Sequence, residues 1–392
     1  MTEWLSLIGI GADGAEGLPA ASRAALDAAE VVFGGPRHLA MIAHPDKRPW
    51  PVPFDLAPVL ALRGRRVAVL ASGDPCWHGV GGALAQVLAP GEWRAWPAPS
   101  VFSLAAARLG WRLEAVLSLG LHAAPFARLR PHLAPGLRAI LTLRDGAAPL
   151  ALAEYLRARG FGPSRLVVME HLGGPRERLT EARADALPDI PFAPLVSVAL
   201  EVAGSGAVIP LASGIADDAF AHDGQISKRP LRALALSALA PRHGELLWDI
   251  GAGSGSIGIE WLLRHPSLRC IGVESNPTRA ARARANAARL GVGLEIREGA
   301  ALDLLPALPD PQAVFLGGGA DPVLLAALWA RLPPGARLVA HAVTLETEAL
   351  LTDAHARHGG ELLRIALSHA APLGRKRGWK AAFPVVQWNV TR

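Results

Sequence analysis

The chain has 392 residues, of which 51% are hydrophobic and 19% charged, so it is long enough for two or three domains and too apolar to be disordered. Its 40 basic and 34 acidic residues give a net charge of +6, and all but four of the basic residues are arginine. The only two cysteines, Cys76 and Cys270, exclude a disulfide scaffold and a thiolate zinc site, and we expect a reducing cytoplasm. No apolar run reaches the ~18 residues of a membrane span, and the first residues lack a signal-peptide pattern.

In the first half of the chain, short apolar runs alternate with helical patterns, which predicts an α/β architecture. The predicted strands are 5–11, 67–71, 115–119, 139–143, 165–169 and 195–202, and the predicted helices are 18–29, 80–88, 101–109 and 149–159. We predict two lobes, 1–112 and 113–205. A stretch rich in Gly, Ser and Pro at 203–214 predicts a linker, so we place the boundary between domains 1–205 and 206–392 near 205–212.

The second half alternates helices and strands more regularly. The predicted helices are 231–239, 256–264, 278–290, 322–332 and 346–357, and the predicted strands are 245–250, 269–274, 294–298, 313–316, 337–342, 361–366 and 383–390. These elements predict a doubly wound sheet that ends in a strand pair. A dinucleotide-binding domain would continue with a second βαβ half, so the ending favours the methyltransferase variant, in which the last strand inserts antiparallel.

A glycine-rich loop follows the first strand of this half and opens a helix, so its backbone amides can face a ligand. Its glycines are Gly251, Gly253 and Gly255. The spacing 253–258 also fits a dinucleotide fingerprint, so the glycines alone do not separate NAD from S-adenosylmethionine (SAM). Asp249 would repel a pyrophosphate but suits the cationic amino end of SAM, and Glu274 at the end of the next strand can accept hydrogen bonds from a ribose. The alternative is a tight turn without a ligand.

Further glycines follow the third and fourth strands of the second half. Gly299 precedes Ala300 and Ala301, where an adenine would pack, and Gly317 and Gly318 mark a close backbone approach to cofactor or substrate. The Asn-Pro-Pro-aromatic motif of base-amino methylases is absent at this place, which counts against methylation of nucleic-acid bases.

The first half has a ligand-facing loop of its own. Ser72-Gly73-Asp74-Pro75 follows the predicted strand 67–71, but Gly-Asp-Pro is also common turn chemistry. Two further segments strengthen the prediction of a binding site, namely the glycines at 9 and 11 upstream and the segment 99–111 downstream.

Both halves resemble known families at these motifs. The first half is similar to the tetrapyrrole (corrin/porphyrin) methylases at 8–14, 72–75, 99–105 and 169–178, and the second half resembles the precorrin C15-methyltransferases and decarboxylases at 217–234, 247–257 and 384–388. The whole chain therefore resembles the fused C5,15-methyltransferases (decarboxylating) of cobalamin biosynthesis. It departs from the pattern at Ser227, where Thr is common, and at Pro230, where Glu is common.

This resemblance implies a bilobed tetrapyrrole-methylase fold followed by a Rossmann-like, seven-stranded SAM methyltransferase domain, with one SAM per half. It implies methylation of precorrin-6B at C-5 by the first half, then methylation at C-15 and loss of carbon dioxide from the C-12 acetate by the second half, giving precorrin-8. The expected partner is a polycarboxylate tetrapyrrole, with no nucleic acid, membrane or metal. By analogy with related enzymes, we expect a homo-oligomer.

The resemblance also assigns roles to residues. The expected cofactor-binding residues are Gly9, Gly11, Ser72, Gly73, Asp74, Pro75, Ser103, Ala105, Leu172, Gln225, Ser227, Asp249, Gly251, Gly253, Ser254, Gly255, Glu274, Ser275, Ala300, Ala301, Gly317 and Gly318. The candidate catalytic residues are His222, Asp223 and Lys228; His222 and Asp223 either close over SAM or shuttle a proton, or they form a turn. Arg229, Arg375, Lys376 and Arg377 are expected to hold substrate carboxylates.

Other hypotheses stay open at this point. The basic cluster at 375–380 could be a solvated loop or a weak RNA-binding element. The chain could also be an RNA or other small-molecule methyltransferase fused to a tetrapyrrole-methylase-like module, or a basic binding protein without catalytic activity. Binding of S-adenosylhomocysteine would separate the enzymatic hypotheses from the last one.

Overall fold

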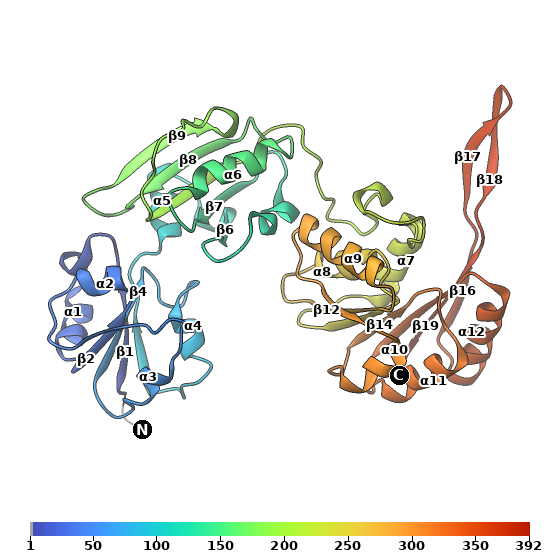
Figure 1. Cartoon of the computed structure of the whole chain (residues 1–392), viewed down its shortest axis with the longest axis horizontal. Helices are drawn as coiled ribbons and strands as arrows, with labels where there is room; N and C mark the ends of the chain where they lie inside the picture. The colour runs from blue at the N-terminus through green and yellow to red at the C-terminus, as the bar shows by residue number, and fades with distance from the viewer. Residues whose placement is uncertain (1–2) are drawn as a thin grey trace. The chain divides into compact units, whose positions relative to one another are not determined.

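The computed structural model describes residues 3–392, which form two compact units. Unit 1 comprises the residues up to 126 together with 133–207, and unit 2 comprises 127–132 and 208–392. Both units are mixed α/β structures, as the sequence predicts (Figure 1). Among residues 3–392, no helix is both long and apolar enough to cross a membrane.

The first sheet of unit 1 has five parallel strands in the order β3-β2-β4-β1-β5. Its strands are β1 (Leu5–Ile10), β2 (Val31–Gly34), β3 (Lys47–Pro49), β4 (Val67–Ser72) and β5 (Trp93–Trp96), and its helices are α1 (Ala20–Asp27), α2 (Pro36–Ala40), α3 (Ala57–Leu60) and α4 (Val80–Leu84). Side chains from both faces of β1, β2 and β4 are buried in two separate apolar clusters. Burial on both faces explains why these strands are nearly continuous apolar runs.

The second sheet of unit 1 is mixed and has the order β6-β7-β10-β8-β9. Its strands are β6 (Leu117–Gly120), β7 (Arg138–Thr142), β8 (Arg165–Glu170), β9 (Arg178–Arg183) and β10 (Val196–Glu201), with helices α5 (Val101–Leu109) and α6 (Ala148–Arg157). The apolar face of α5 packs on Ile140 and Val167 of this sheet. The chain therefore passes from the first sheet to the second between β5 and α5, before the division expected near residue 112.

Unit 2 contains a seven-stranded sheet in the order β13-β12-β11-β14-β15-β19-β16. Its strands are β11 (Leu246–Ile250), β12 (Arg269–Glu274), β13 (Glu295–Glu298), β14 (Ala313–Leu316), β15 (Arg337–Ala342), β16 (Glu361–Ile365) and β19 (Val385–Thr391). The first five strands in this order are parallel, and β19 lies between β15 and β16, antiparallel to both. The carboxyl ends of the parallel strands thus share one edge, where open α/β sheets bind ligands.

Helices cover both faces of this sheet. They are α7 (Arg229–Leu239), α8 (Ser256–Leu262), α9 (Pro277–Leu290), α10 (Ala301–Leu304), α11 (Pro322–Arg331) and α12 (Leu345–His358). The helices α7, α8 and α9 share one apolar cluster with the sheet, and α11 and α12 share another. Asn276 caps the start of α9, and its Oδ1 accepts the amide hydrogens of Thr278 and Arg279. A helix N-terminus leaves such amides without partners inside the helix.

A separate hairpin projects from unit 2 between β16 and β19 (Figure 1). It consists of β17 (Ser368–Leu373) and β18 (Lys376–Ala381), which pair antiparallel. The sequence predicts a loop here, and the structure corrects this. The hairpin has no buried face to produce an alternating pattern, since even Leu373 and Trp379 are 70% and 79% exposed.

Candidate functional site

Unit 2 has a cavity of about 1290 Å³ at the carboxyl ends of β11, β12, β14 and β15, which we call cavity 2. The segment 224–228 and the base of the hairpin complete its wall. Many of the residues expected from the sequence line it: Gln225, Ser227, Lys228, Asp249, Gly251, Gly253, Ser254, Glu274, Ser275, Ala300, Ala301, Gly317 and Gly318. The parallel topology brings these loops together, because each one follows a strand that ends at the same edge.

The glycine loop after β11 is open toward cavity 2. Gly251 has a φ of +75°, and a side chain at this position would meet no atom within 4 Å. The backbone can therefore approach a ligand here without an intervening Cβ. Gly255 differs: an added Cβ would lie 3.1 Å from Ala283 Cβ, so this glycine permits the loop to pack on α9 and is not part of the wall.

Two buried acids hold this loop in place. Glu274 is 5% exposed; its Oε2 accepts the amide hydrogen of Gly253 at 2.8 Å, and its Oε1 accepts that of Asn276 at 2.9 Å. Asp249 is 1% exposed, and its Oδ2 accepts the amide hydrogen of Gly258 at 3.0 Å. Burial, assisted by the negative charge of Glu274 and opposed by the Gly258 bond, raises the pKa of Asp249 to about 7. A cation in the cavity would favour the ionised form.

His341 on β15 also lines cavity 2, although the sequence offered no local signal for it. Its Nε2 lies 3.0 Å from Oε1 of Gln387, its cross-strand partner on β19. Its ring packs edge-on against Phe315, with 5.1 Å between centroids. Burial lowers the pKa of His341, which keeps the imidazole neutral at pH 7. His341 and Gln387 meet only because β19 inserts beside β15. The residues of the two strands do not by themselves predict this pairing.

The structure does not place His222 and Asp223 at the wall of cavity 2. Asp223 pairs with Arg279 at 2.8 Å and with Arg282 at 3.0 Å, and these hydrogen-bonded guanidinium groups hold the pKa of its carboxyl well below the usual range. The structure thus places the Asp223 carboxylate in two ion pairs outside the cavity wall, and proton transfer by this residue stays a prediction. His222 Nδ1 accepts the amide hydrogen of Gly224 at 3.0 Å, which makes it part of the turn.

The basic residues expected to bind substrate also lie outside the wall. Arg375, Lys376 and Arg377 are exposed around the turn of the hairpin, whereas its base, at His369 and Phe383, lines the cavity. Arg229 is exposed at the first residue of α7. The sequence predicts that the basic segment 375–380 lies near the substrate. In the structure it lies at and beyond the turn of the hairpin, and none of its side chains lines the cavity.

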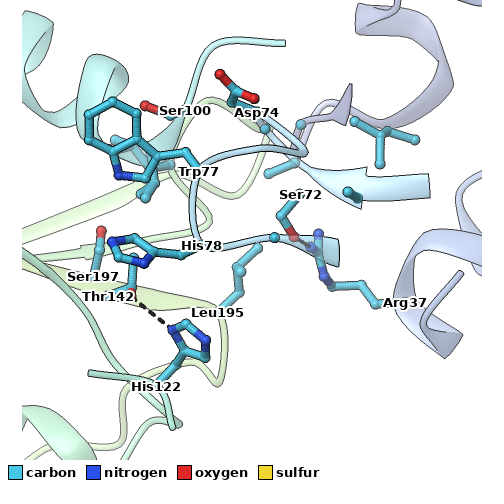
Figure 2. Close-up of a pocket in the computed structure, with 18 of the residues that line it drawn as sticks. Arg37, Ser72, Asp74, Trp77, His78, Ser100, His122, Thr142, Leu195 and Ser197 are labelled. Atoms are coloured by element: carbon cyan, nitrogen blue, oxygen red, sulfur yellow. Dashed lines mark hydrogen bonds between the residues drawn. The ribbon is translucent and has the colours of Figure 1, made fainter. Parts of the chain in front are cut away.

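Unit 1 has a second cavity, of about 500 Å³, which we call cavity 1. Five of the expected cofactor-binding residues line it: Gly11, Ser72, Gly73, Asp74 and Leu172. Figure 2 shows the loop after β4, with Ser72, Asp74 and His78, facing side chains from the second sheet that include Thr142 and Ser197. The cavity therefore lies where the two sheets of unit 1 meet.

Four expected residues of unit 1 do not line cavity 1: Gly9, Pro75, Ser103 and Ala105. A Cβ on Gly9 would lie 1.9 Å from the carbonyl oxygen of Gly73, so this glycine allows the 72–75 loop to cross β1. Ser103 lies in the first turn of α5, where its hydroxyl is 3.0 Å from that of the N-cap Ser100. Ala105 and Pro75 are buried. In the described structure these four residues pack behind the wall of cavity 1, and their role in cofactor binding stays a prediction.

Several polar groups of cavity 1 were not expected from the sequence. Arg37 and His38 reach the wall from α2, a five-residue helix without a clear pattern. His122 Nδ1 lies 3.2 Å from the hydroxyl of Thr142 (Figure 2). The hydroxyl of Ser197 is buried in the wall without a hydrogen-bond partner in the described chain. Buried polar groups of this kind are normally satisfied, so the cavity suits a ligand with polar atoms.

Neither cavity is built around a metal-binding cluster. In the described part of the chain, no three His, Cys, Asp or Glu side chains are placed to hold a metal ion together. The acids of cavity 2 instead bond to backbone amides.

Comparisons with known proteins match both units. Residues 5–188 match the family model described as Tetrapyrrole (Corrin/Porphyrin) Methylases, and 218–392 match the Precorrin methyltransferase domain. A Sinorhizobium relative named precorrin-6Y C(5,15)-methyltransferase (decarboxylating) is 49% identical over 402 aligned residues, covering 100% of this chain and 97% of its own.

Two shorter relatives are also similar. A Salmonella typhimurium (strain LT2) protein named cobalt-precorrin-6B C(15)-methyltransferase (decarboxylating) is 35% identical over 41% of this chain and 85% of its own. The crystal structure of the C-terminal domain of precorrin-6Y C5,15-methyltransferase from Rhodobacter capsulatus is 50% identical, covers 47% of this chain and 100% of its own, and gives a TM-score of 0.46. On the full-length match, this chain belongs to the precorrin-6Y C(5,15)-methyltransferase (decarboxylating) family.

Proposed function

We propose that this chain is a bifunctional, SAM-dependent enzyme of cobalamin biosynthesis. It methylates precorrin-6B at C-5 and C-15 and decarboxylates the C-12 acetate side chain, giving precorrin-8. The observation that carries this proposal is that each family-matched unit has its own cavity beside a glycine turn at the end of a strand. We assign one SAM to each cavity.

We assign C-5 methylation to unit 1, and C-15 methylation with decarboxylation to unit 2. In support, the Salmonella relative carries only the C(15) and decarboxylating activities in its name and matches less than half of this chain. We further propose that unit 1 is a bilobed tetrapyrrole-methylase fold and unit 2 a Rossmann-like methyltransferase fold. The two sheets of unit 1 and the antiparallel insertion of β19 in unit 2 favour this classification.

The residues of cavity 2 fit SAM. The buried carboxyl of Asp249 has one hydrogen-bond partner and can face the amino group of the methionine portion. Glu274 retains acceptor capacity for ribose hydroxyls, and Ala300 and Ala301 offer an apolar surface to the adenine. When bound, SAM supplies an activated methyl group on a sulfonium sulfur.

The chain's own contribution is alignment and proton transfer. A reduced tetrapyrrole is an electron-rich carbon nucleophile, so the protein needs only to hold the ring carbon, methyl group and sulfur in line. Proton transfer to or from a ring carbon is still required. In place of His222 and Asp223, we assign this task in unit 2 to His341, which lines the cavity and is oriented by Gln387. The homo-oligomer suggested by the family resemblance remains a prediction.

The test is an assay of the full chain with precorrin-6B and SAM, read by product mass. We expect the gain of two methyl groups, the loss of one carbon dioxide, and one S-adenosylhomocysteine per methyl transferred. An unchanged mass would refute the proposal. Transfer of labelled methyl groups to RNA in a parallel reaction would favour the alternative of an RNA methyltransferase.

A variant with Asp249 replaced by Asn tests the division of labour within the full chain. If unit 2 methylates C-15, this variant, assayed at a SAM concentration that saturates only unit 1, accumulates a product whose one added methyl group is at C-5. A product methylated only at C-15 would reverse the assignment of the two units.

A further inference from the structure

Arg37 lies in a cluster of polar side chains at the wall of cavity 1. Its guanidinium donates to the hydroxyl of Ser72 at 2.7 Å and lies 2.8 Å from Nε2 of His38. The Ser72 hydroxyl is in turn 2.9 Å from His38 Nε2. Burial, together with the charge of Arg37, lowers the pKa of His38 to about 4, so the imidazole is neutral at pH 7. The cluster therefore carries one positive charge and no negative one.

Most arginines of unit 1 are paired with acids. Ion pairs to carboxylates are formed by Arg48, Arg63, Arg65, Arg66, Arg94, Arg108, Arg112, Arg138, Arg157, Arg165, Arg178 and Arg183. Arg37 is half-buried, yet within residues 3–392 no carboxylate oxygen lies within 4 Å of its guanidinium. Burial lowers the pKa of Arg37, as expected for a cation that lacks an anionic neighbour.

Arg37 lies where it can contact a ligand in cavity 1. Arg37, His38 and Ser72 all line cavity 1, and Figure 2 shows Arg37 reaching toward Ser72 while the carboxylate of Asp74 points away from it. In addition, Nδ1 of His38 is buried without a hydrogen-bond partner in the described residues. A half-buried cation without an anionic neighbour is less stable than one that is paired, and a ligand that brings an anion to it supplies the missing partner.

We propose that Arg37, positioned by Ser72 and His38, binds a carboxylate group of the ligand in cavity 1. The planar guanidinium can form a two-point contact with a carboxylate, which an ammonium cannot. This inference rests on the proposed function, under which two carboxylates can reach the cavity. One belongs to the methionine portion of SAM, and the other is an acidic side chain of the tetrapyrrole.

Two measurements on the full chain separate these sources. The test variant is Arg37→Met, and Arg66→Met is the control, because Arg66 is 70% exposed and its carboxylate partner is 3.5 Å away. In calorimetric titration with S-adenosylhomocysteine, a donor carboxylate at Arg37 predicts that one of two sites weakens by about tenfold or more. A substrate carboxylate predicts unchanged titration, with KM for precorrin-6B in C-5 methylation raised by about tenfold and kcat retained.

A second variant, Arg37→Lys, keeps the positive charge but cannot form a two-point contact with a carboxylate. We expect a smaller change than in Arg37→Met, in the same quantity, which is either the affinity for S-adenosylhomocysteine or the KM for precorrin-6B. If Arg37→Met does not fold, Arg37→Lys replaces it as the test variant. The inference is overturned if Arg37→Met keeps both constants within about twofold of wild type. A wild-type chain that does not methylate C-5 would instead overturn the proposed function, and this inference with it.

Discussion

Asp249→Asn removes one negative charge from the wall of cavity 2 while keeping the shape of the side chain. In the wild type, the Oδ2 of Asp249 accepts the amide hydrogen of Gly258, and an asparagine oxygen can accept the same bond. The glycine loop should therefore keep its conformation in the variant. What changes is the interaction of the site with a cation, which under the proposed function is the amino group of SAM.

The magnitude follows from the pKa of Asp249, which burial raises from 3.8 to about 7. The difference between these two pKa values corresponds to about 4 kcal/mol of preference for the neutral form in the ligand-free protein. Between these two pH values the folded chain holds a proton that the unfolded chain releases. The free energy of unfolding therefore falls as pH rises through this window, and the Asn variant should lack that dependence.

Ligand binding has the opposite pH dependence. A cation beside Asp249 favours the carboxylate, so S-adenosylhomocysteine should bind unit 2 more tightly as pH rises from 6 to about 8, with release of up to about one proton. Losing the charged partner should weaken this site by about tenfold to a hundredfold. Titration calorimetry in two buffers of different ionisation enthalpy measures both quantities.

Asp353→Asn is the matched control, because Asp353 is an exposed carboxylate on α12. It should leave affinity, proton release and the pH dependence of unfolding unchanged. If Asp249→Asn binds as tightly as the wild type, or if both variants lose the same affinity, Asp249 serves only to hold the glycine loop and our account of its charge is wrong.

Three further substitutions test separate parts of the structure. Arg232 is fully buried and pairs with Glu260 at 2.5 Å. Arg232→Met should therefore lower the free energy of unfolding, measured by urea titration, by about 3–5 kcal/mol. A loss below about 1 kcal/mol would contradict a buried ion pair. Gly9→Ala would place a Cβ 1.9 Å from the carbonyl oxygen of Gly73. Titration with S-adenosylhomocysteine should then show one of the two sites lost and the other unchanged. Two intact sites would refute the close contact between Gly9 and Gly73. Replacing 375–377 by glutamine should leave KM for precorrin-6B within about twofold, because these side chains lie outside the cavity wall; a tenfold rise would restore their role in substrate binding.

The elements of unit 2 were largely predictable because each carries its own local signal. The strands 269–274, 313–316 and 337–342 lie where their apolar runs predict, and α9 covers the predicted helix 278–290 with one more residue, Pro277, at its start. In unit 1, β2, β3, β5 and α2 were missed because each spans five residues or fewer, too short to show a period. The hairpin of β17 and β18 was missed because it lacks a buried face.

The sequence by itself determined the α/β class, the glycine turns and the acids at strand ends, because these depend on neighbours a few residues away. Only the tertiary structure decided which side chains meet at a cavity. Arg37 and Ser72 are 35 residues apart, and His341 and Gln387 are 46 apart, yet each pair is in hydrogen-bond contact. Contacts of this kind depend on strand order and register, which arise from packing across the whole sheet. For the same reason, the basic turn at 375–377 was expected at the site and lies away from it.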